Sequence, residues 1–447
     1  METLMRKDTN HITAVLPVLT DTLSRLKAKT ASNNPPTIRK TQFIIVVKCK
    51  GCKYTPFMFF PEKALLYLVI STKFGQSFNP SDNMTVTSNL TKILLVFLPC
   101  LALSFSCQKK REYYSSGDFE SVKKVDTHLH INTDDGRYLE FAALQNFSIL
   151  SPNVDAGTPV EKQLSIAAVH RQNYPGNFAF LGTFTVDSFG TADFVRNVIG
   201  QIDRAIERGA SGIKIWKNIG MTLKDSSGRY VMADDPAFDP IFQYLTDKKI
   251  PLMAHLGEPR NCWLPLEQMT DSGDYRYFKD HPEYHMLLHP EAPSYEDQIN
   301  ARDNVLKKFP DLTFVAAHIA SLEWNLDEVA KRLDSYPLMS IDLSARMAHV
   351  QRQSVADYEK VRDFFIRYQD RILYGIDITI SEDGDRFDAV SSDMLRRWRS
   401  DWAYLATDSI QVMENISGDI RGLHLPKTVI DKVYYENVNR HFNAFKE

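Results

Sequence analysis

Val-Asp-Thr-His-Leu-His, residues 125–130, places two histidines one residue apart at the end of an apolar run. Side chains alternate between the two faces of a strand, so His128 and His130 share one face. At the end of a strand both imidazoles can reach one divalent ion. The pair alone is ambiguous, because same-face histidines are as often ordinary packing or a solvated strand end. The positions of the other histidines and acids therefore decide what this stretch does.

From Lys123 onward, short apolar runs alternate with amphipathic helical stretches, which indicates parallel strands joined by crossover helices. The predicted strands are Lys124–Leu129, Phe147–Leu150, Phe178–Thr185, Gly212–Trp216, Pro251–His255, Thr313–Ala317, Leu338–Leu343 and Ile372–Ile376. The predicted helices are Thr191–Arg208, Asp235–Lys248, Tyr295–Lys308, Asn325–Leu333 and Val355–Tyr368. This order predicts an α/β fold, a (β/α)8 TIM barrel. An open doubly wound sheet is the alternative, but no glycine-rich phosphate turn follows the first strand.

Polar side chains recur where the predicted strands end. In a barrel the chemistry lies at the C-terminal ends of the strands. Histidines or acids fall there on five strands, and two lysines mark the fourth. The residues, in chain order, are His128, His130, Lys214, Lys217, His255, His318, Asp342 with Ser344 and Arg346, and Asp377. Packing alone would rarely produce such a set, so we expect one functional site at this end.

With these residues in place, the sequence from about Val125 to its end resembles the amidohydrolase superfamily. Within it, the sequence is most similar to the branch related to aminocarboxymuconate semialdehyde decarboxylase, the amidohydrolase-2 type. The resemblance is carried by His128-Leu129-His130, His255, His318 and Asp377. In addition, the stretch 436–442 resembles the Asn-x-x-Arg-x-Phe helix that closes this family. The branch includes hydrolases, lactonases, hydratases and nonoxidative decarboxylases.

The resemblance implies one divalent metal ion held by His128, His130, His255 and Asp377, with water in the open position. Imidazole and carboxylate ligands suit zinc, our first choice, and also manganese or iron. Such an ion lowers the pKa of its water toward neutrality. Asp377 would then also serve as general base. The resemblance gives His318 the role of polarising the substrate oxygen or holding the nucleophile.

Basic and aromatic residues around the predicted site suggest substrate contacts. Superfamily members with two metals bridge them with a carboxylated lysine on the fourth strand, but this branch is generally mononuclear. We therefore interpret Lys217, and likewise Lys214, as a substrate anchor or a structural ion pair. Arg260 and Arg346 could each bind a carboxylate bidentately or form a salt bridge to a neighbouring acid. Trp263 either lines the pocket or packs against other aromatic residues.

The expected function is a metal-dependent hydrolase of a small ester, lactone or amide. The alternative is a nonoxidative decarboxylase of an aromatic or muconate-like acid. A third hypothesis is a binding protein on a barrel that has lost its chemistry. The net charge of −3 and the lack of a basic run argue against nucleic acid as a partner. A homodimer stays open, because dimers are common in related barrels.

The N-terminal part of the sequence differs from the rest. Residues 84–107 resemble a bacterial lipoprotein signal: a polar stretch ending in Lys92, an apolar run too short to span a bilayer, and Cys107 as the lipidated residue. We expect Met84 to be the biological start and residues 1–83 to come from a start codon assigned too far upstream. The alternative is a buried apolar segment of a real N-terminal domain. Residues 108–122 are expected to be a polar tether before the barrel domain, 123–447. This predicts a lipid-anchored protein of the cell envelope, or a cytoplasmic one if the signal is not used.

Overall fold

The computed structural model describes residues 111–382, 386–413, 416 and 418–445. The predicted extension 1–83, the signal segment 84–107 with Cys107, and the first three residues of the predicted tether lie outside the described residues. In the described part of the chain, no helix combines the length and the apolar character needed to cross a membrane.

Eight parallel strands of the described residues follow one another in chain order around a closed barrel, which confirms the predicted (β/α)8 fold. These strands are β1 Lys124–Asp126, β3 Phe147–Pro152, β4 Phe178–Leu181, β5 Ile213–Ile215, β6 Leu252–Ala254, β7 Phe314–Ala316, β8 Met339–Asp342 and β9 Ile372–Leu373. A parallel bridge between Gly182 and Ile213 joins β4 to β5. The barrel closes where the Thr127 amide donates a hydrogen bond of 2.9 Å to the Tyr374 carbonyl.

The first and last strands continue beyond the barrel as a second parallel pair. Strand β2, Leu129–Asn132, pairs with β10, Ile378–Ser381. The predicted first strand is therefore interrupted at Thr127 and His128, between β1 and β2. Next to β10, Asp377 has a left-handed backbone with a φ of 58°. His128 and Asp377 thus lie at the two points where the chain leaves the barrel wall, and the Asp377 amide donates to the His128 carbonyl at 2.8 Å.

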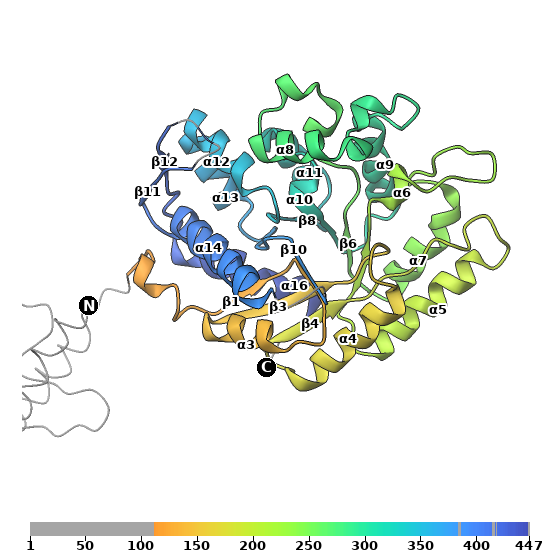
Figure 1. Ribbon diagram of the computed structural model, residues 1–447, viewed down its shortest axis with the longest axis horizontal. Helices are drawn as coiled ribbons and strands as arrows, with labels where there is room; N and C mark the ends of the chain where they lie inside the picture. The colour runs from red at the N-terminus through yellow and green to blue at the C-terminus, as the bar shows by residue number, and fades with distance from the viewer. Residues whose placement is uncertain (1–110, 383–385, 414–415, 417, 446–447) are drawn as a thin grey trace, which may run out of the picture. The chain divides into compact units, whose positions relative to one another are not determined.

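Helices surround the strands, as Figure 1 shows. The longer helices are α3 Arg137–Leu144, α4 Val160–Asn173, α5 Phe194–Glu207, α7 Asp239–Asp247, α8 Ser272–Asp280, α9 Tyr295–Lys308, α11 Leu326–Ser335, α12 Met347–Ala356, α13 Tyr358–Arg367 and α14 Phe387–Ala406. The short ones are α6 Asn218–Met221, α10 Ala317–Ala320, α15 Lys427–Asp431, the π-helix η7 Lys432–Glu436 and α16 Asn437–Phe442. Helix α9 has the predicted bounds, since the Ser294 and Asp297 side chains form a capping box at its start.

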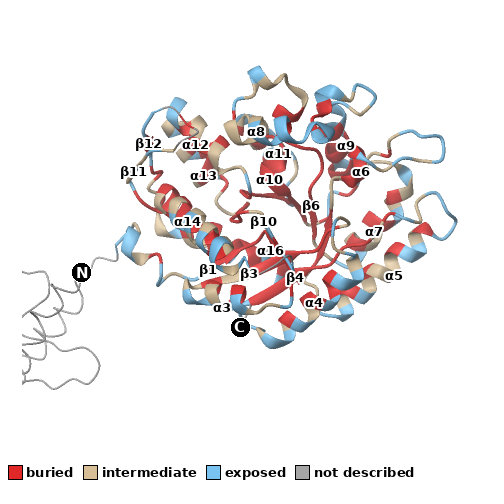
Figure 2. Cartoon of the chain, viewed as in Figure 1, coloured by how far each residue is buried: buried red, intermediate tan, exposed pale blue. Residues whose placement is uncertain are grey.

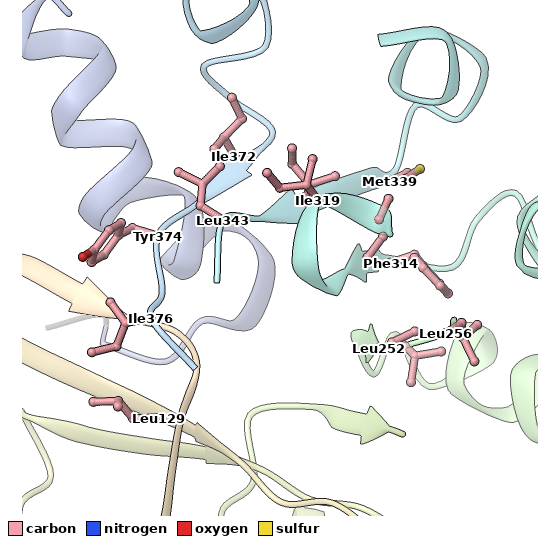
Figure 3. Close-up of a cluster of buried hydrophobic side chains, with 14 of the residues drawn as sticks. Leu129, Leu252, Leu256, Phe314, Ile319, Met339, Leu343, Ile372, Tyr374 and Ile376 are labelled. Atoms are coloured by element: carbon pink, nitrogen blue, oxygen red, sulfur yellow. The ribbon is translucent and has the colours of Figure 1, made fainter. Parts of the chain in front are cut away.

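The core has the layering that a barrel requires. Figure 2 shows burial along the strands and on the inward sides of the helices, with exposed residues on the outward sides. Figure 3 shows part of this core, where Leu129 and Ile376, which follow the first and the last barrel strand, lie near Tyr374 among other buried side chains. The strands are buried on both faces, which explains their nearly continuous apolar sequences.

Residues 111–122, predicted as part of a polar tether, pack against the barrel domain instead. The Tyr114 hydroxyl donates to Asp431 at 2.7 Å, and Tyr113 forms a bridge with Pro426. Phe119 is buried in the main core. The three aromatic side chains supply the apolar contact that holds this segment, although most of its residues are polar. Residues 111–122 are therefore part of the folded domain and not of a tether.

We predict that one buried carboxyl makes the stability of the fold depend on pH. Asp401 on α14 is buried and accepts a hydrogen bond of 2.8 Å from Tyr374. Burial raises the pKa of Asp401 from 3.8 to about 7, against the opposing effects of Tyr374 and two arginines. Between these values the folded chain keeps a proton that the unfolded chain releases. The free energy of unfolding should therefore fall as the pH rises from 4 to 7.

Asp401→Asn should reduce this fall and raise the free energy of unfolding at pH 8 by up to roughly 4 kcal/mol. The rest of the fall should persist, because burial also raises the pKa of Asp126 to about 7. Urea unfolding of both proteins at pH 5 and pH 8 measures the effect. The same pH slope in both proteins would contradict the prediction.

Candidate metal centre

Three histidine side chains converge on one carboxylate at the C-terminal ends of the strands. Asp377 Oδ1 lies 3.3 Å from His130 Nε2 and 3.9 Å from His128 Nε2. Its other oxygen lies 3.9 Å from His318 Nε2. His128 and His318 are almost fully buried, whereas the Asp377 side chain is 28% exposed. Residues predicted from three separate strands thus form one centre with an opening toward solvent.

His255 joins this centre through His318. Its Nδ1 lies 3.1 Å from His318 Nε2, and the two ring centroids are 4.1 Å apart. The ligand atoms of His128, His130 and Asp377 all lie within 4.8 Å of one another, and His255 is not part of that tightest group. The four predicted ligands are therefore in one place, with His255 on the side of His318.

Backbone carbonyls determine which ring nitrogen of two histidines faces the centre. His130 Nδ1 lies 2.8 Å from the Pro152 carbonyl, and His318 Nδ1 lies 3.0 Å from the Ser344 carbonyl. A carbonyl can only accept, so each Nδ1 carries the proton and each Nε2 keeps a lone pair directed at Asp377. This arrangement is the one in which histidines bind metal ions. The donor set therefore fits a divalent cation such as zinc.

The buried carboxylate of Asp342 fixes the ring of His128, the third histidine, in the same way. Asp342, at the end of β8, lies 2.7 Å from His128 Nδ1. Its other oxygen accepts hydrogen bonds from the His318 amide at 2.7 Å and from Ser344 Oγ at 2.5 Å. Burial works to raise the pKa of Asp342, but the hydrogen bond from His128 and the electrostatic interactions with His128, His318 and Lys214 hold it well below its usual value. Asp342 is therefore ionised and fixes two histidines at once, a role that the sequence analysis did not assign.

Lys214 on β5 lies inside the centre. This differs from the interpretation of the sequence, which gave Lys214 and Lys217 the same role. Its side chain is fully buried, and its Nζ lies 3.2 Å from His128 Nε2. Burial lowers the pKa of Lys214 to about 8, against the attraction of Asp342 and Asp377. An amine with this pKa is partly unprotonated near neutral pH. The alternation of side chains along β5 points Lys214 into the barrel, whereas Lys217 follows the end of the strand.

The other fourth-strand lysine forms an ion pair, as one of its two interpretations predicted. Lys217 Nζ binds Glu258, a buried residue of the loop after β6. The second oxygen of Glu258 lies 3.5 Å from His255 Nε2 and 3.9 Å from Arg346 Nη2. Glu258 thus connects Lys217 and Arg346 to the outer nitrogen of His255. The sequence analysis did not single out Glu258, although its place three residues after His255 is a usable signal.

Arg260 and Trp263 make their contacts within the loops above the barrel. The Arg260 guanidinium lies 4.4 Å from the centroid of the Trp324 ring. Trp263 donates from its indole nitrogen to the Pro293 carbonyl at 3.2 Å, and its ring meets Tyr295 edge to face at 5.6 Å. For Trp263 these contacts match the aromatic packing that was the alternative to lining a pocket.

His318 belongs to a strained turn. The four residues 318–321, His-Ile-Ala-Ser, all have a left-handed backbone, with φ values of 59°, 56°, 60° and 51°. For residues other than glycine this conformation costs about 1–2 kcal/mol each. Strain of this kind persists only where the surrounding structure enforces it, and such places are often functional. The sequence gives no sign of this turn, because glycine is absent from it.

A family model and several solved structures are similar to this chain. A family model described as amidohydrolase matches residues 125–442, well over half of the chain. Similar solved structures include the uncharacterized TIM-barrel protein Bb4693 from Bordetella bronchiseptica, with 13% identity over 72% of this chain and 99% of that chain and a TM-score of 0.44. Another is the 4-oxalomesaconate hydratase LigJ from Rhodopseudomonas palustris, with 12% identity over 72% and 96% of the two chains and a TM-score of 0.38.

A third similar structure is amidohydrolase 2 from Bifidobacterium longum subsp. infantis, with 14% identity over 72% of this chain and 99% of that chain and a TM-score of 0.37. No curated protein sequence matches the chain. The extent of the family match, which begins at Val125 and includes all the residues of the centre, shows that the chain belongs to the amidohydrolase family.

Proposed function

We propose that the chain is a metal-dependent hydrolase acting on a small ester, lactone or amide. The observation that carries this proposal is the meeting of three imidazole Nε2 atoms with the Asp377 carboxylate, while the opposite nitrogens are held by fixed acceptors. In our assignment His128, His130, His255 and Asp377 hold one divalent ion, zinc in first place and manganese or iron as alternatives. When bound, such an ion supplies Lewis acidity and a water of lowered pKa.

Asp377 is suited to receive a proton from the attacking water. Burial works to raise the pKa of Asp377, but the electrostatic interactions with the nearby His128, His130 and His318 rings hold it well below its usual value. The carboxylate is therefore ionised at neutral pH, and its 28% exposed side chain is open to the substrate side. Oδ2, which lies 3.9 Å from His318 Nε2, can accept the proton while Oδ1 stays directed at His128 and His130.

His318 is better suited to hold the nucleophile than to polarise the substrate oxygen. Burial lowers the pKa of His318 well below its usual value, so the ring is neutral. Its proton is on Nδ1, facing the Ser344 carbonyl 3.0 Å away. The Nε2 atom that faces Asp377 is then an acceptor, and it can orient a water by accepting one of its hydrogens.

Arg346 supports a substrate that bears a carboxylate. Its guanidinium side chain is 11% exposed, and its ion pair with Glu258 is long, at 3.9 Å. The Nε atom is buried and has no hydrogen-bond partner within the described residues. A guanidinium near the metal centre with a weak ion pair and one unpartnered donor can bind a carboxylate. The same feature supports the alternative function, nonoxidative decarboxylation of an aromatic or muconate-like acid.

A substrate panel tests the proposal. The purified full-length protein, loaded with zinc or manganese, is incubated with esters, lactones and amides and, in parallel, with aromatic and muconate-like acids. Acid production from the first group supports the hydrolase. Release of CO₂ from the second group without acid production from the first would replace it with the decarboxylase. Activity on neither group would favour a barrel that only binds.

We expect about one metal ion per chain, because the four proposed ligands His128, His130, His255 and Asp377 lie in one centre. Elemental analysis of protein from its native host measures this ratio. About two ions per chain would overturn the single-ion assignment, and Lys214 would then be the residue placed to bridge them. In that case Lys214→Met should reduce the ratio, whereas Lys217→Met should not.

We also propose that residues 84–107 direct the protein to the cell envelope, with Met84 as the start and Cys107 as the lipidated residue. The support is the sequence pattern of an apolar run followed by a small residue and cysteine. Intact-mass analysis of the protein from its native host tests this. A mature chain that retains residues 1–83 would overturn it.

A further inference from the structure

Helix α9 binds the strained turn at His318 from one side. The Arg302 guanidinium donates to the Ala320 carbonyl, and the Tyr295 hydroxyl donates to the Ser321 carbonyl at 2.5 Å. Tyr295 and Arg302 are seven positions apart, so they lie on the same face of the helix. Two successive carbonyls of a left-handed turn are therefore held by two donors from one helix.

The Arg302 side chain is itself fixed. It is 1% exposed, and it forms two hydrogen bonds with the Asp303 carboxylate, at 2.7 and 3.1 Å. The second oxygen of Asp303 accepts from Arg332 on α11 at 3.1 Å. A buried guanidinium needs such partners, because an unpaired charge in the interior is strongly destabilising. With Asp303 binding one side of the group, the remaining nitrogen is directed at the turn.

The turn is held on its other sides as well. The His318 amide donates to Asp342 at 2.7 Å, and Ser321 Oγ donates to the carbonyl of Leu256, the residue after His255, at 3.1 Å. Ile319 is one of the buried core side chains drawn in Figure 3. The four residues cannot relax to an ordinary right-handed turn without breaking these contacts and moving the His318 ring.

We propose that Arg302 is a positioning residue, which enforces the left-handed turn and so keeps His318 Nε2 facing Asp377. The effect on catalysis rests on the proposed function, since it requires His318 to act on the nucleophile. The effect on the backbone is independent of the proposed function. The physical reason is that none of the four residues favours a positive φ, and hydrogen bonds from outside must supply what glycine would provide.

Arg302→Met tests this, since methionine keeps much of the side-chain volume but cannot donate. A displacement of His318 by about 1 Å should lower kcat by about 100-fold. Arg332→Met is the matched control: it removes the other arginine bound to Asp303 and has no contact with the turn. Both variants should be less heat-stable, but only Arg302→Met should lose kcat. An equal loss of kcat in both would overturn the proposal.

A second substitution separates positioning from stability. Glycine at position 320 adopts a positive φ without strain. In the Arg302→Met background, Ala320→Gly should therefore restore kcat by roughly tenfold. In the Arg332→Met background it should not raise kcat. If Arg302→Met does not fold, Tyr295→Phe removes the other donor of α9 and takes its place in this comparison. Absence of rescue would overturn the proposal.

Hydrogen exchange gives a readout that needs no activity. The amides of residues 318–322 should exchange faster in Arg302→Met than in the unmodified protein, with Arg332→Met unchanged in this segment. If the unmodified protein is inactive on every substrate, the proposed function fails while this measurement still decides the role of Arg302. Unchanged exchange in Arg302→Met would refute that role.

Discussion

Asp377→Asn is expected to abolish bound metal and activity together. Asp377 is the carboxylate on which His128, His130 and His318 converge. Asparagine keeps the shape but lacks the negative charge that favours a divalent ion, and it cannot accept the proton of the attacking water. We expect less than one tenth of the bound metal and at least about a 1,000-fold loss of kcat/KM. Elemental analysis and assays on the same preparation measure both.

Two further variants make this result interpretable. His128→Ala should have the same outcome, because it removes another ligand of the same group. Asp134→Asn is the matched control, since Asp134 is an exposed acid near the end of β2. It should retain metal and activity. Full metal content in Asp377→Asn would contradict the ligand assignment, whatever the activity of that variant.

Asp342→Asn is expected to weaken metal binding by about 10–100-fold, the usual effect of losing a group that orients a ligand histidine. Asp342 accepts from His128, from the His318 amide and from Ser344. Asparagine has one acceptor oxygen and presents an NH₂ group at the other position. Facing that NH₂, the His128 ring would favour the tautomer with its proton on Nε2. That proton would point into the metal centre and block coordination.

Competition with a chelator measures the metal affinity of this variant, and circular dichroism checks that it is folded. Asp401→Asn is the control, because it makes the same change at a buried carboxyl that binds Tyr374 and not a ligand histidine. Its metal affinity should stay close to that of the unmodified protein. A folded Asp342→Asn protein with unchanged affinity would show that Asp342 does not orient His128.

The barrel was predictable because its signals are local. Apolar runs bounded by turns identified all eight strands, with ends shifted by a few residues where the pairing stops. Helix α9 was predicted with its observed bounds, since a capping serine precedes it and a proline follows soon after. Among the longer helices, α3, α4, α8, α12 and α14 were not predicted. Helix α4 is weakly amphipathic, which removes the periodic signal on which a sequence reading depends. The predicted helix Val355–Tyr368 began within the last two residues of α12. In the structure Asp357 caps α13 and separates the two helices.

The site was predictable where strand ends carry histidine or aspartate, because barrel geometry brings those ends together. The contacts that surround the site could not be predicted. The place of Lys214 depends on which face of β5 points inward, and the role of Asp342 depends on its contact with His128, 214 positions away in the chain. The left-handed turn after β7 is imposed by α9 and not by its own sequence. Such features arise from tertiary contacts, which composition and spacing do not encode.

Closure of the barrel joins Thr127 to Tyr374, which are 247 positions apart. During synthesis the paired histidines leave the ribosome long before Asp377, so the unfinished chain carries imidazoles without their carboxylate. Contacts over such separations form slowly. An ion that binds only the finished centre stabilises the closed barrel over every partly folded form. The supply of metal in the cell should therefore govern how much newly made protein reaches its native state.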